Sequence, residues 1–451
     1  MSEINYDGWS NILTGLGRKG KDKRVGLEAT WERLSRYEVE SIYAVDDAAE
    51  KVVDDVVGEA FRKDIIFTHG NANGDFNKEM HDYLTTINFF PKFMKAAKQG
   101  RLYGGAVMLF GIDDGQDPDE EVNFDQIRSV KWFDVVNRWD LSVMGVQSDV
   151  SRKGFRDPLL YSFSDGALSE SSLAGMLVNA SRTVRLDGAT LPKELYEANN
   201  YFHDSVLTKF LNPLKNWNSS YDSVATLLQD FAAGVFKMKG LSKLIGAGMD
   251  EAVMKRLSLI DMKRSLVKSV VVDSEEDFER KATPLSGIKD VLERMDNRLV
   301  SASRMPHTRL LGQGSTGNLS GAGDSEEKNW HDYVKTKQTG EYYPKLMEAL
   351  VILLRAKDNP ITKGQIPKGF DFSFPPVKEM NELQKAQIYK TQAEGDQIYM
   401  MNQVLDPDEV AISRFGDNDE MKIRLEIREQ NLEEDVIKTP GDPNDPSGDA
   451  E

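Results

Sequence analysis

The first hundred residues contain apolar positions that recur with helical spacing. In residues 35–61, apolar side chains fall every three or four positions, and aspartates occupy positions between them. This pattern predicts one amphipathic helix. A second helix is predicted over about 78–98, ending near Gly100. Residues 102–111 contain a glycine pair and are otherwise nearly all apolar, which predicts a buried strand.

Short apolar segments between glycines and prolines predict a strand-rich region next. They are residues 130–136, 161–163 and 184–186. Together with the preceding helices, they predict an α+β domain over 27–200.

Helical periodicity returns after residue 200. Two helices are predicted at 205–214 and 221–236, with a break at 240–248. Two further helices, at 250–263 and 288–303, flank two β-rich segments that could pair as a hairpin, at 266–272 and 278–284. We expect this excursion to bring its two helices together in antiparallel fashion.

Residues 303–357 combine a glycine-rich loop with a long helical pattern. The loop has five glycines between 312 and 323 and one large apolar residue, Leu319, so we expect it to be mobile. The helix that follows carries Pro344 within its apolar pattern, which predicts a kink near 341–343.

The C-terminal part is more polar. A strand is predicted at 370–374 and a glutamine-rich helix at 380–404, whose thin apolar stripe is typical of an assembly or rim element. A short helix at 407–415 follows, and the tail from Thr439 is rich in Pro, Gly and Asp, which predicts disorder.

Composition narrows the class of protein. The 451 residues are 39% hydrophobic and 29% charged, with a net charge of −17, which indicates a globular chain of two or more domains. The acidic balance argues against wrapping duplex DNA. The chain has no cysteine, which excludes disulfides and thiolate zinc sites. We find no secretory signal and no apolar run long enough to cross a membrane, so we expect the cytoplasm, or a particle assembled there.

One basic run stands out near the start of the chain. Residues 18–24 hold five lysines and arginines among glycines. A solvated linker is the simpler interpretation; the alternative is a contact with a neighbouring subunit or with nucleic acid.

No set of residues forms a convincing catalytic site. Gly312, Gly314 and Gly317 match a dinucleotide-binding fingerprint, but a helix rather than a strand is predicted before them. The five histidines lack metal-binding spacing, and His203 begins the one His-x-Ser/Thr motif that we find. The residues themselves therefore indicate a structural or assembly protein.

Several ordered motifs resemble those of tailed-bacteriophage portal proteins, in a phage and prophage subgroup once catalogued as a domain of unknown function. The motifs are RLYGGAVML at 101–109 with DDG at 113–115, NASRTV at 179–184 with Gly188 and LP at 191–192, and MPHTRLLG at 305–312 with YVKTKQ at 333–338. Their order and spacing cover about 30–430.

Two positions depart from the subgroup pattern. Asn179 stands where histidine is usual, and FHDS at 202–205 replaces a more usual Trp-Gly-x-Ser. Some relatives in the subgroup are linked to anti-defence proteins that bind or cleave cyclic nucleotides. The missing second His-x-Ser/Thr motif argues against that activity here.

The resemblance implies a helix-rich α+β portal subunit with wing, stem, clip and crown. Its expected parts are a flexible N-terminal arm at 1–26, a wing at 27–247, stem helices with a clip at 248–304 (the clip at about 265–287), a tunnel-loop region at 305–324, a long kinked helix returning to the wing at 325–372, a crown at 373–438 and a disordered tail at 439–451.

The resemblance also implies a set of contacts. Candidates for the DNA channel are Arg304, Arg309, Gln313, Ser315, Thr316, Asn318, Lys263, Arg264 and Arg298. Candidates for the clip contact with terminase or adaptor are Val270, Asp273, Glu275, Glu276 and Phe278.

The implied assembly is a ring, typically a dodecamer, at one capsid vertex of the virion, built in the host cytoplasm. Its expected partners are the major capsid protein, the terminase large subunit, a head–tail adaptor and non-specifically bound double-stranded DNA, with no membrane, cofactor or catalysis. Two alternatives remain: a nucleotide-binding anti-defence protein, and another head-completion protein.

Overall fold

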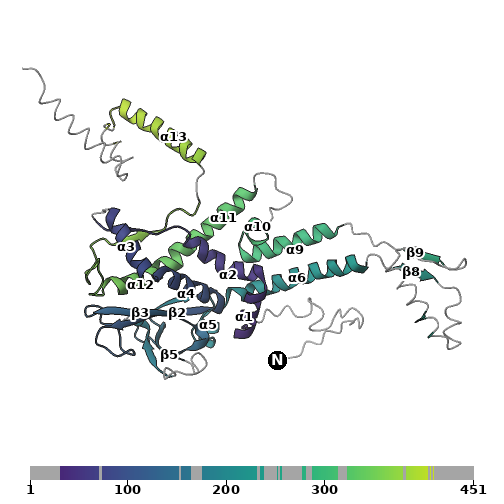
Figure 1. Cartoon of the computed structure of the whole chain (residues 1–451), viewed down its shortest axis with the longest axis horizontal. Coiled ribbons are helices and arrows are strands. Elements are labelled where there is room, and N and C mark those ends of the chain that lie inside the picture. Colours follow the sequence, from purple (N-terminus) through teal and green to yellow (C-terminus); the bar gives the residue numbers. More distant parts are fainter. Residues whose placement is uncertain are drawn as a thin grey trace, which may run out of the picture. The chain divides into compact units, whose positions relative to one another are not determined.

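The computed structural model describes most of the chain between residues 31 and 410. The described residues are 31–70, 74–151, 154–163, 175–230, 234–237, 251, 254–255, 277–280, 287–312, 322–378, 382–404, 407 and 410. They form a helix-rich α+β fold, as predicted (Figure 1). The chain divides into two units, Met1–Val377 and Lys378–Glu451, which are described separately below.

Two helices open the described chain where one was predicted. They are α1 (Arg36–Val45) and α2 (Asp47–Ala60). Asp46 lies between them in an extended conformation, and its side chain accepts hydrogen bonds from the first N–H groups of α2. The aspartate thus acts as an N-cap that starts a new helix, which the apolar spacing alone did not reveal.

The second predicted helix is also two helices, α3 (Gly74–Thr86) and α4 (Phe89–Tyr103). Asn88 separates them in the left-handed conformation, at φ 56°. The helix α4 ends at Gly104, whose φ of 90° ordinary residues rarely adopt. The following strand therefore starts later than predicted.

The first sheet contains three antiparallel strands in the order β3-β2-β7. They are β2 (Gly105–Asp113), β3 (Ser129–Asn137) and β7 (Thr183–Asp187). Alternate side chains of β2 enter two different cores. Ala106 and Met108 join the main core with α4, whereas Val107 and Leu109 join a second core. Burial on both faces explains why this segment reads as a continuous apolar run.

The second core is shared with another three-stranded antiparallel sheet, β4-β5-β6. Its strands are β4 (Leu141–Val146), β5 (Pro158–Phe163) and β6 (Leu177–Asn179). The two sheets thus cover each other, and α4 covers the other face of β2.

A buried ion pair joins two of the motifs found in the sequence. Arg182 contacts Asp114 at 3.1 Å, and the two side chains are 4% and 0% exposed. The Nε of Arg182 also donates to the carbonyl of Glu120. Burial alone would raise the pKa of Asp114, but backbone N–H donors and Arg182 lower it below its usual value. The NASR and DDG motifs therefore fix the turn after β2.

A single long helix replaces the two predicted after residue 200. After a short helix, α5 (Lys193–Ala198), the chain forms α6 (Val206–Asp230) with Pro213 inside it. The end of the predicted second helix is instead the strand β8 (Gly234–Lys237).

The strand β8 pairs with a strand from the predicted clip. Its antiparallel partner is β9 (Asp277–Arg280), with Phe236 opposite Phe278. The predicted strand at 266–272 lies outside the described residues.

The helix α9 (Ile288–Ser303) packs antiparallel to α6 (Figure 1). Trp217 Nε1 and the Tyr221 hydroxyl of α6 both donate to Asp296 Oδ1 of α9, at 2.7 and 3.0 Å. Only Glu251, Met254 and Lys255 of the other predicted partner helix are described. The helix observed against α9 is therefore α6.

A π-turn lies where the kink was predicted, near 341–343. The helix α11 (Ala322–Lys337) continues through a π-turn (Gln338–Tyr342) into α12 (Tyr343–Leu354). Pro344 lies in the first turn of α12, where its missing N–H is tolerated. The i→i+5 pattern widens the helix just before the proline.

Two short strands close the first unit. They are β1 (Ile66–Thr68) and β10 (Asp371–Ser373), which pair antiparallel. The strand β10 lies within the predicted 370–374 strand.

The second unit contains α13 (Glu382–Met401), which exposes Tyr389, Ile398 and Met401. Among the described residues, no helix could span a membrane.

Candidate functional site

The candidate site is the attachment of the glycine-rich loop, called here the loop root. It comprises residues 304–312, between the end of α9 and the last described residue before the loop, and includes the short helix α10 (His307–Leu310). The described chain continues at Ala322, in α11. Residues 313–321, with most of the loop, lie outside the described residues.

Apolar burial and three hydrogen bonds hold the loop root against α2, α9 and α11. Met305 and Leu310 are buried in the main core. Lys51 of α2 donates to the Leu310 carbonyl at 3.0 Å. His307 Nε2 lies 2.8 Å from Asn297 Oδ1 of α9, and its backbone N–H donates to Glu326 of α11. The short helix is too small to be stable alone, so these contacts position it.

Arg309 provides the electrostatic contact of the loop root. Its guanidinium lies 2.9 Å from Glu59 of α2; the side chains are 32% and 5% exposed. It also lies over the Trp330 ring of α11, 5.6 Å from the ring centroid. A buried carboxylate needs such a partner, and the ring adds a cation–π attraction. One arginine thus ties the loop root to two helices.

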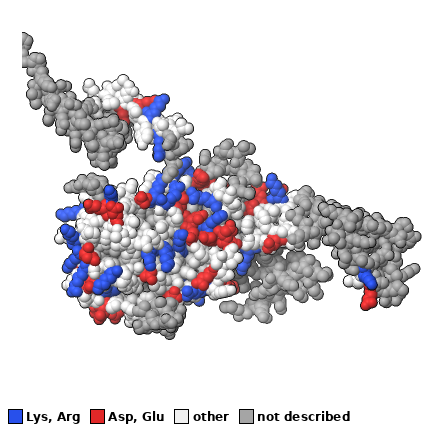
Figure 2. Space-filling view, viewed as in Figure 1, with Lys and Arg blue, Asp and Glu red and all other residues white. Residues whose placement is uncertain are grey.

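The same ion pair lines an open cleft of about 510 Å³. Side chains of both charges line the cleft, including Asp54, Asp55, Arg62 and Lys98. Burial raises the pKa of Asp55 above its usual value. The nearby positive charges of Arg309 and Lys51 act in the opposite direction and limit the rise. Figure 2 shows the same mixture of both signs on the visible face of the described body.

The other predicted channel residues have different surroundings. Arg304 caps α9 in the left-handed conformation, at φ 61°, is exposed, and lies 5.6 Å from the Tyr333 ring centroid. Arg298 is exposed on α9. The remaining channel candidates lie outside the described residues: Lys263, Arg264, Gln313, Ser315, Thr316 and Asn318.

Of the predicted clip contacts, one is described. Phe278 lies in β9 opposite Phe236. Val270, Asp273, Glu275 and Glu276 lie outside the described residues. Among the described candidates, Arg304 and Arg309 both lie in the loop root, against the neighbouring rings of Tyr333 and Trp330. The roles of the channel and clip candidates stay predictions.

The π-turn behind the loop root is fixed to α2. The buried side-chain amide of Gln338 donates to the Ala60 carbonyl at 2.7 Å. The Tyr342 ring packs against Phe61, with ring centroids 5.4 Å apart. The π-turn and the loop root therefore rest on the same helix, α2.

The possible catalytic groups have structural roles where they are described. His203 Nδ1 accepts from the Leu191 N–H, and burial lowers the pKa of His203. Asp204 accepts from Trp31 and Thr208. No group of three acidic or histidine residues among the described residues could hold a metal. Gly312 follows a helix, α10, as predicted, so the strand that a dinucleotide fingerprint requires is not there.

Sequence reasoning missed Lys51 and Glu59, which hold the loop root. Both lie about 250 positions earlier in the chain than the residues they contact. Glu59 falls on the buried side of α2, and a charged residue at such a position is a signal that a partner lies opposite.

A model of the phage portal protein family matches residues 37–398, most of the chain. The chain belongs to the phage portal protein family. Among curated relatives, two proteins named "Anti-CBASS protein Acb1" match: one from Caulobacter sp. (strain RHG1), 23% identical, and one from Sphingomonas paeninsulae, 25% identical. Each match covers 87% of this chain but only 62% of the relative.

Solved structures to which this chain is similar include a chain from the "Neck of native GTA particle computed with C12 symmetry". It is 12% identical, has a TM-score of 0.45, and the match covers 87% of this portal-family chain and 94% of the other.

Proposed function

We propose that this protein is the portal subunit that forms a ring, typically of twelve copies, at one capsid vertex of the virion. The ring would be the channel for DNA during packaging and ejection, without catalysis of its own. The observation that carries this proposal is the family match over residues 37–398.

The helix pair α6–α9 supports an assignment of the stem. These two long helices pack antiparallel, and the chain between them contains the paired strands β8 and β9. We assign α6 and α9 to the stem, with α6 in place of residues 249–264, and the β8–β9 region to the clip. The clip would contact terminase during packaging and a head–tail adaptor afterwards.

The loop root supports a tunnel-loop assignment for the segment between Gly312 and Ala322. Its two ends are held by helices that pack on α2. Such an arrangement would keep the attachment fixed while the glycine-rich segment contacts moving DNA. A net charge of −17 suits DNA that must slide, because tight phosphate binding would stop it.

The remaining parts follow the family plan. The sheets and the helices around them would form the wing, which faces the capsid protein. The exposed apolar residues of α13, such as Tyr389 and Ile398, would be covered in a crown formed by many copies. Assembly would take place in the host cytoplasm.

Electron microscopy of the purified protein tests the ring. We expect closed rings with a central channel. A monomer under all conditions, including within virions, would contradict the proposal, and an open or smaller assembly would favour another head-completion protein.

Shortening the loop within residues 314–323 tests the tunnel role. We expect rings to form normally while DNA packaging or retention falls. A matched control shortens the connection between β4 and β5, at 147–157, most of whose described residues are exposed, and should leave packaging intact. Normal packaging with the shortened tunnel loop would count against the assignment.

The names of two relatives favour a second candidate, an anti-CBASS protein that acts on nucleotides. The chain spans 62% of those relatives, so the named activity can reside in the part that it does not match. Calorimetry with cyclic oligonucleotides separates the two functions. Saturable micromolar binding would support the second candidate. The absence of any heat of binding would contradict it, and the portal role would then be the one function proposed.

A further inference from the structure

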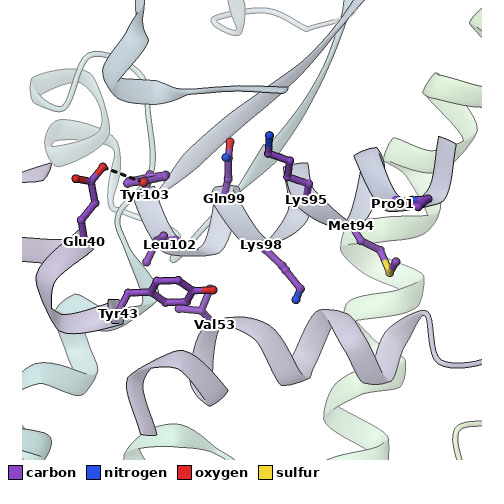
Figure 3. Close-up of a pocket in the computed structure, with 10 residues that line it drawn as sticks. All are labelled: Glu40, Tyr43, Val53, Pro91, Met94, Lys95, Lys98, Gln99, Leu102 and Tyr103. Carbon is purple, nitrogen blue, oxygen red and sulfur yellow. Dashed lines mark hydrogen bonds between the residues drawn. The ribbon is translucent and has the colours of Figure 1, made fainter. Parts of the chain in front are cut away.

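A groove between α1, α2 and α4 is open in the described structure (Figure 3). It has a volume of about 500 Å³, within the range of ligand-binding pockets. Pro91 and Met94 provide accessible apolar surface, and Tyr43 and Tyr103 add two aromatic rings. The lining also includes Val53 and Leu102, which are almost fully buried. We call this the α1–α4 groove.

The polar ends of both tyrosines are already bonded within the chain. Tyr43 donates to Asp54, and Tyr103 donates to Glu40, as the dashed line in Figure 3 shows. The rings are therefore held in place, and what the groove offers an occupant is apolar and aromatic surface.

The groove therefore favours an occupant that presents apolar side chains along one face.

The N-terminal arm contains a segment of this chemistry. Trp9, Ile12, Leu13 and Leu16 follow the i, i+3, i+4, i+7 spacing by which amphipathic peptides enter apolar grooves. The preceding acidic residues, Glu3 and Asp7, suit the exposed Lys95 at the rim of the groove.

The start of the described chain lies close to the groove. Trp31 Nε1 donates to Asp204 at 2.7 Å. The backbone of Asp204 lies against Gly104, where a Cβ would come within 2.7 Å of the Asp204 carbonyl carbon. Gly104 directly follows Tyr103 of the groove. Residues 17–30 can span about 45 Å when extended, so the arm has ample length to return.

We propose that residues 9–16 dock in the α1–α4 groove of their own chain. The docked arm covers the open apolar surface. The basic run at 18–24 then lies on the short connection between the docked segment and Trp31. This inference is independent of the ring and its channel.

Cross-linking of the full-length protein tests the proposal, because the natural chain has no cysteine. The test protein carries Thr14→Cys and Lys95→Cys, and the matched control carries Thr14→Cys and Lys131→Cys, where Lys131 is an exposed lysine on β3. Both are treated with a short bis-maleimide and analysed on denaturing gels and by mass spectrometry. Lys95 and Lys131 are both exposed, so neither change disturbs the core.

We expect intramolecular cross-links to form roughly tenfold faster in the test protein than in the control, because docking raises the effective concentration. Adding Trp9→Asp should reduce the rate to that of the control. Equal rates in test and control would overturn the proposal, as would cross-links between two copies. An unchanged rate with Trp9→Asp would overturn docking through the apolar face.

Discussion

Two arginine–carboxylate pairs stabilise two different regions of this portal-family protein. At the sheet, Arg182 makes three contacts of 3.1–3.2 Å with Asp114, away from solvent. At the loop root, Arg309 makes one contact of 2.9 Å with Glu59, beside an open cleft. The same residue types thus fix a turn in one region and fasten a loop attachment in the other.

The difference between the pairs lies in their exposure to water. Neither member of the sheet pair can be solvated if its partner is lost, whereas Arg309 is about one third exposed. Breaking a buried pair costs much more than breaking an exposed one. The sheet pair is therefore suited to a contact that stays formed in the folded protein. The loop-root pair is suited to a contact that can break during local unfolding.

The largest effect is expected for Asp114→Asn. This change leaves the Arg182 guanidinium buried without a counter-charge, and should lower the free energy of unfolding by about 3–5 kcal/mol. Urea unfolding measures it. The control is Asp125→Asn, which breaks the exposed pair with Arg355 and should cost less than about 1 kcal/mol. Equal losses in the two variants would remove the distinction drawn here.

A smaller effect is expected for Glu59→Gln. The change removes the charge opposite Arg309, and should cost about 1–2 kcal/mol, because water reaches the arginine. Hydrogen exchange of the backbone N–H groups at 307–311 should accelerate more than that of the sheet. If both stability and exchange match the wild type, Glu59 does not hold the loop root.

The α6–α9 pair provides a third comparison. Trp217→Phe keeps an aromatic ring but removes one of two donors to Asp296, so we expect a loss of about 1 kcal/mol in urea unfolding. Tyr221→Phe removes the other, more exposed donor and serves as the control with a smaller loss. The opposite order would show that the more exposed bond is the stronger one.

The smallest effect is expected with pH. Because the folded pKa of Asp114 lies below its usual value, its charged form stabilises the fold above the unfolded pKa of about 3.9. That contribution is lost as the pH falls through the lowered folded pKa. The stability difference between wild type and Asp114→Asn should be constant above about pH 4 to 5 and shrink below it. A difference that grows on acidification would contradict this sign.

Local patterns predicted the types of element better than their ends. The apolar run at 102–111 correctly indicated a buried strand, and Pro344 drew attention to the segment where the structure has a π-turn. The breaks at Asp46 and Asn88 were missed, because a polar residue within a periodic pattern can either face solvent or cap a helix. Only the backbone conformation distinguishes these cases.

The candidate site was partly predictable. The sequence marked Arg304, Arg309 and the glycine-rich loop, but their partners Tyr333 and Glu59 could not be paired with them from spacing. The pairing of α9 with α6 was also missed, because the apolar spacing predicted two separate helices at 205–214 and 221–236 where a single helix, α6, contains Pro213.

The π-turn also explains how one long helix keeps a single side toward the core. From Trp330 onward, buried residues recur at every fourth position: Trp330, Val334, Gln338, Tyr342, Leu346, Leu350 and Leu354. In a regular α-helix each four-residue step turns about 40° too far, so six steps would carry the stripe most of the way round the axis. The wider turn at 338–342 takes back part of this rotation. The wider turn holds about one extra residue within the rotation of a regular helix, so deleting one residue there should restore the regular helix and turn α12 little relative to α11.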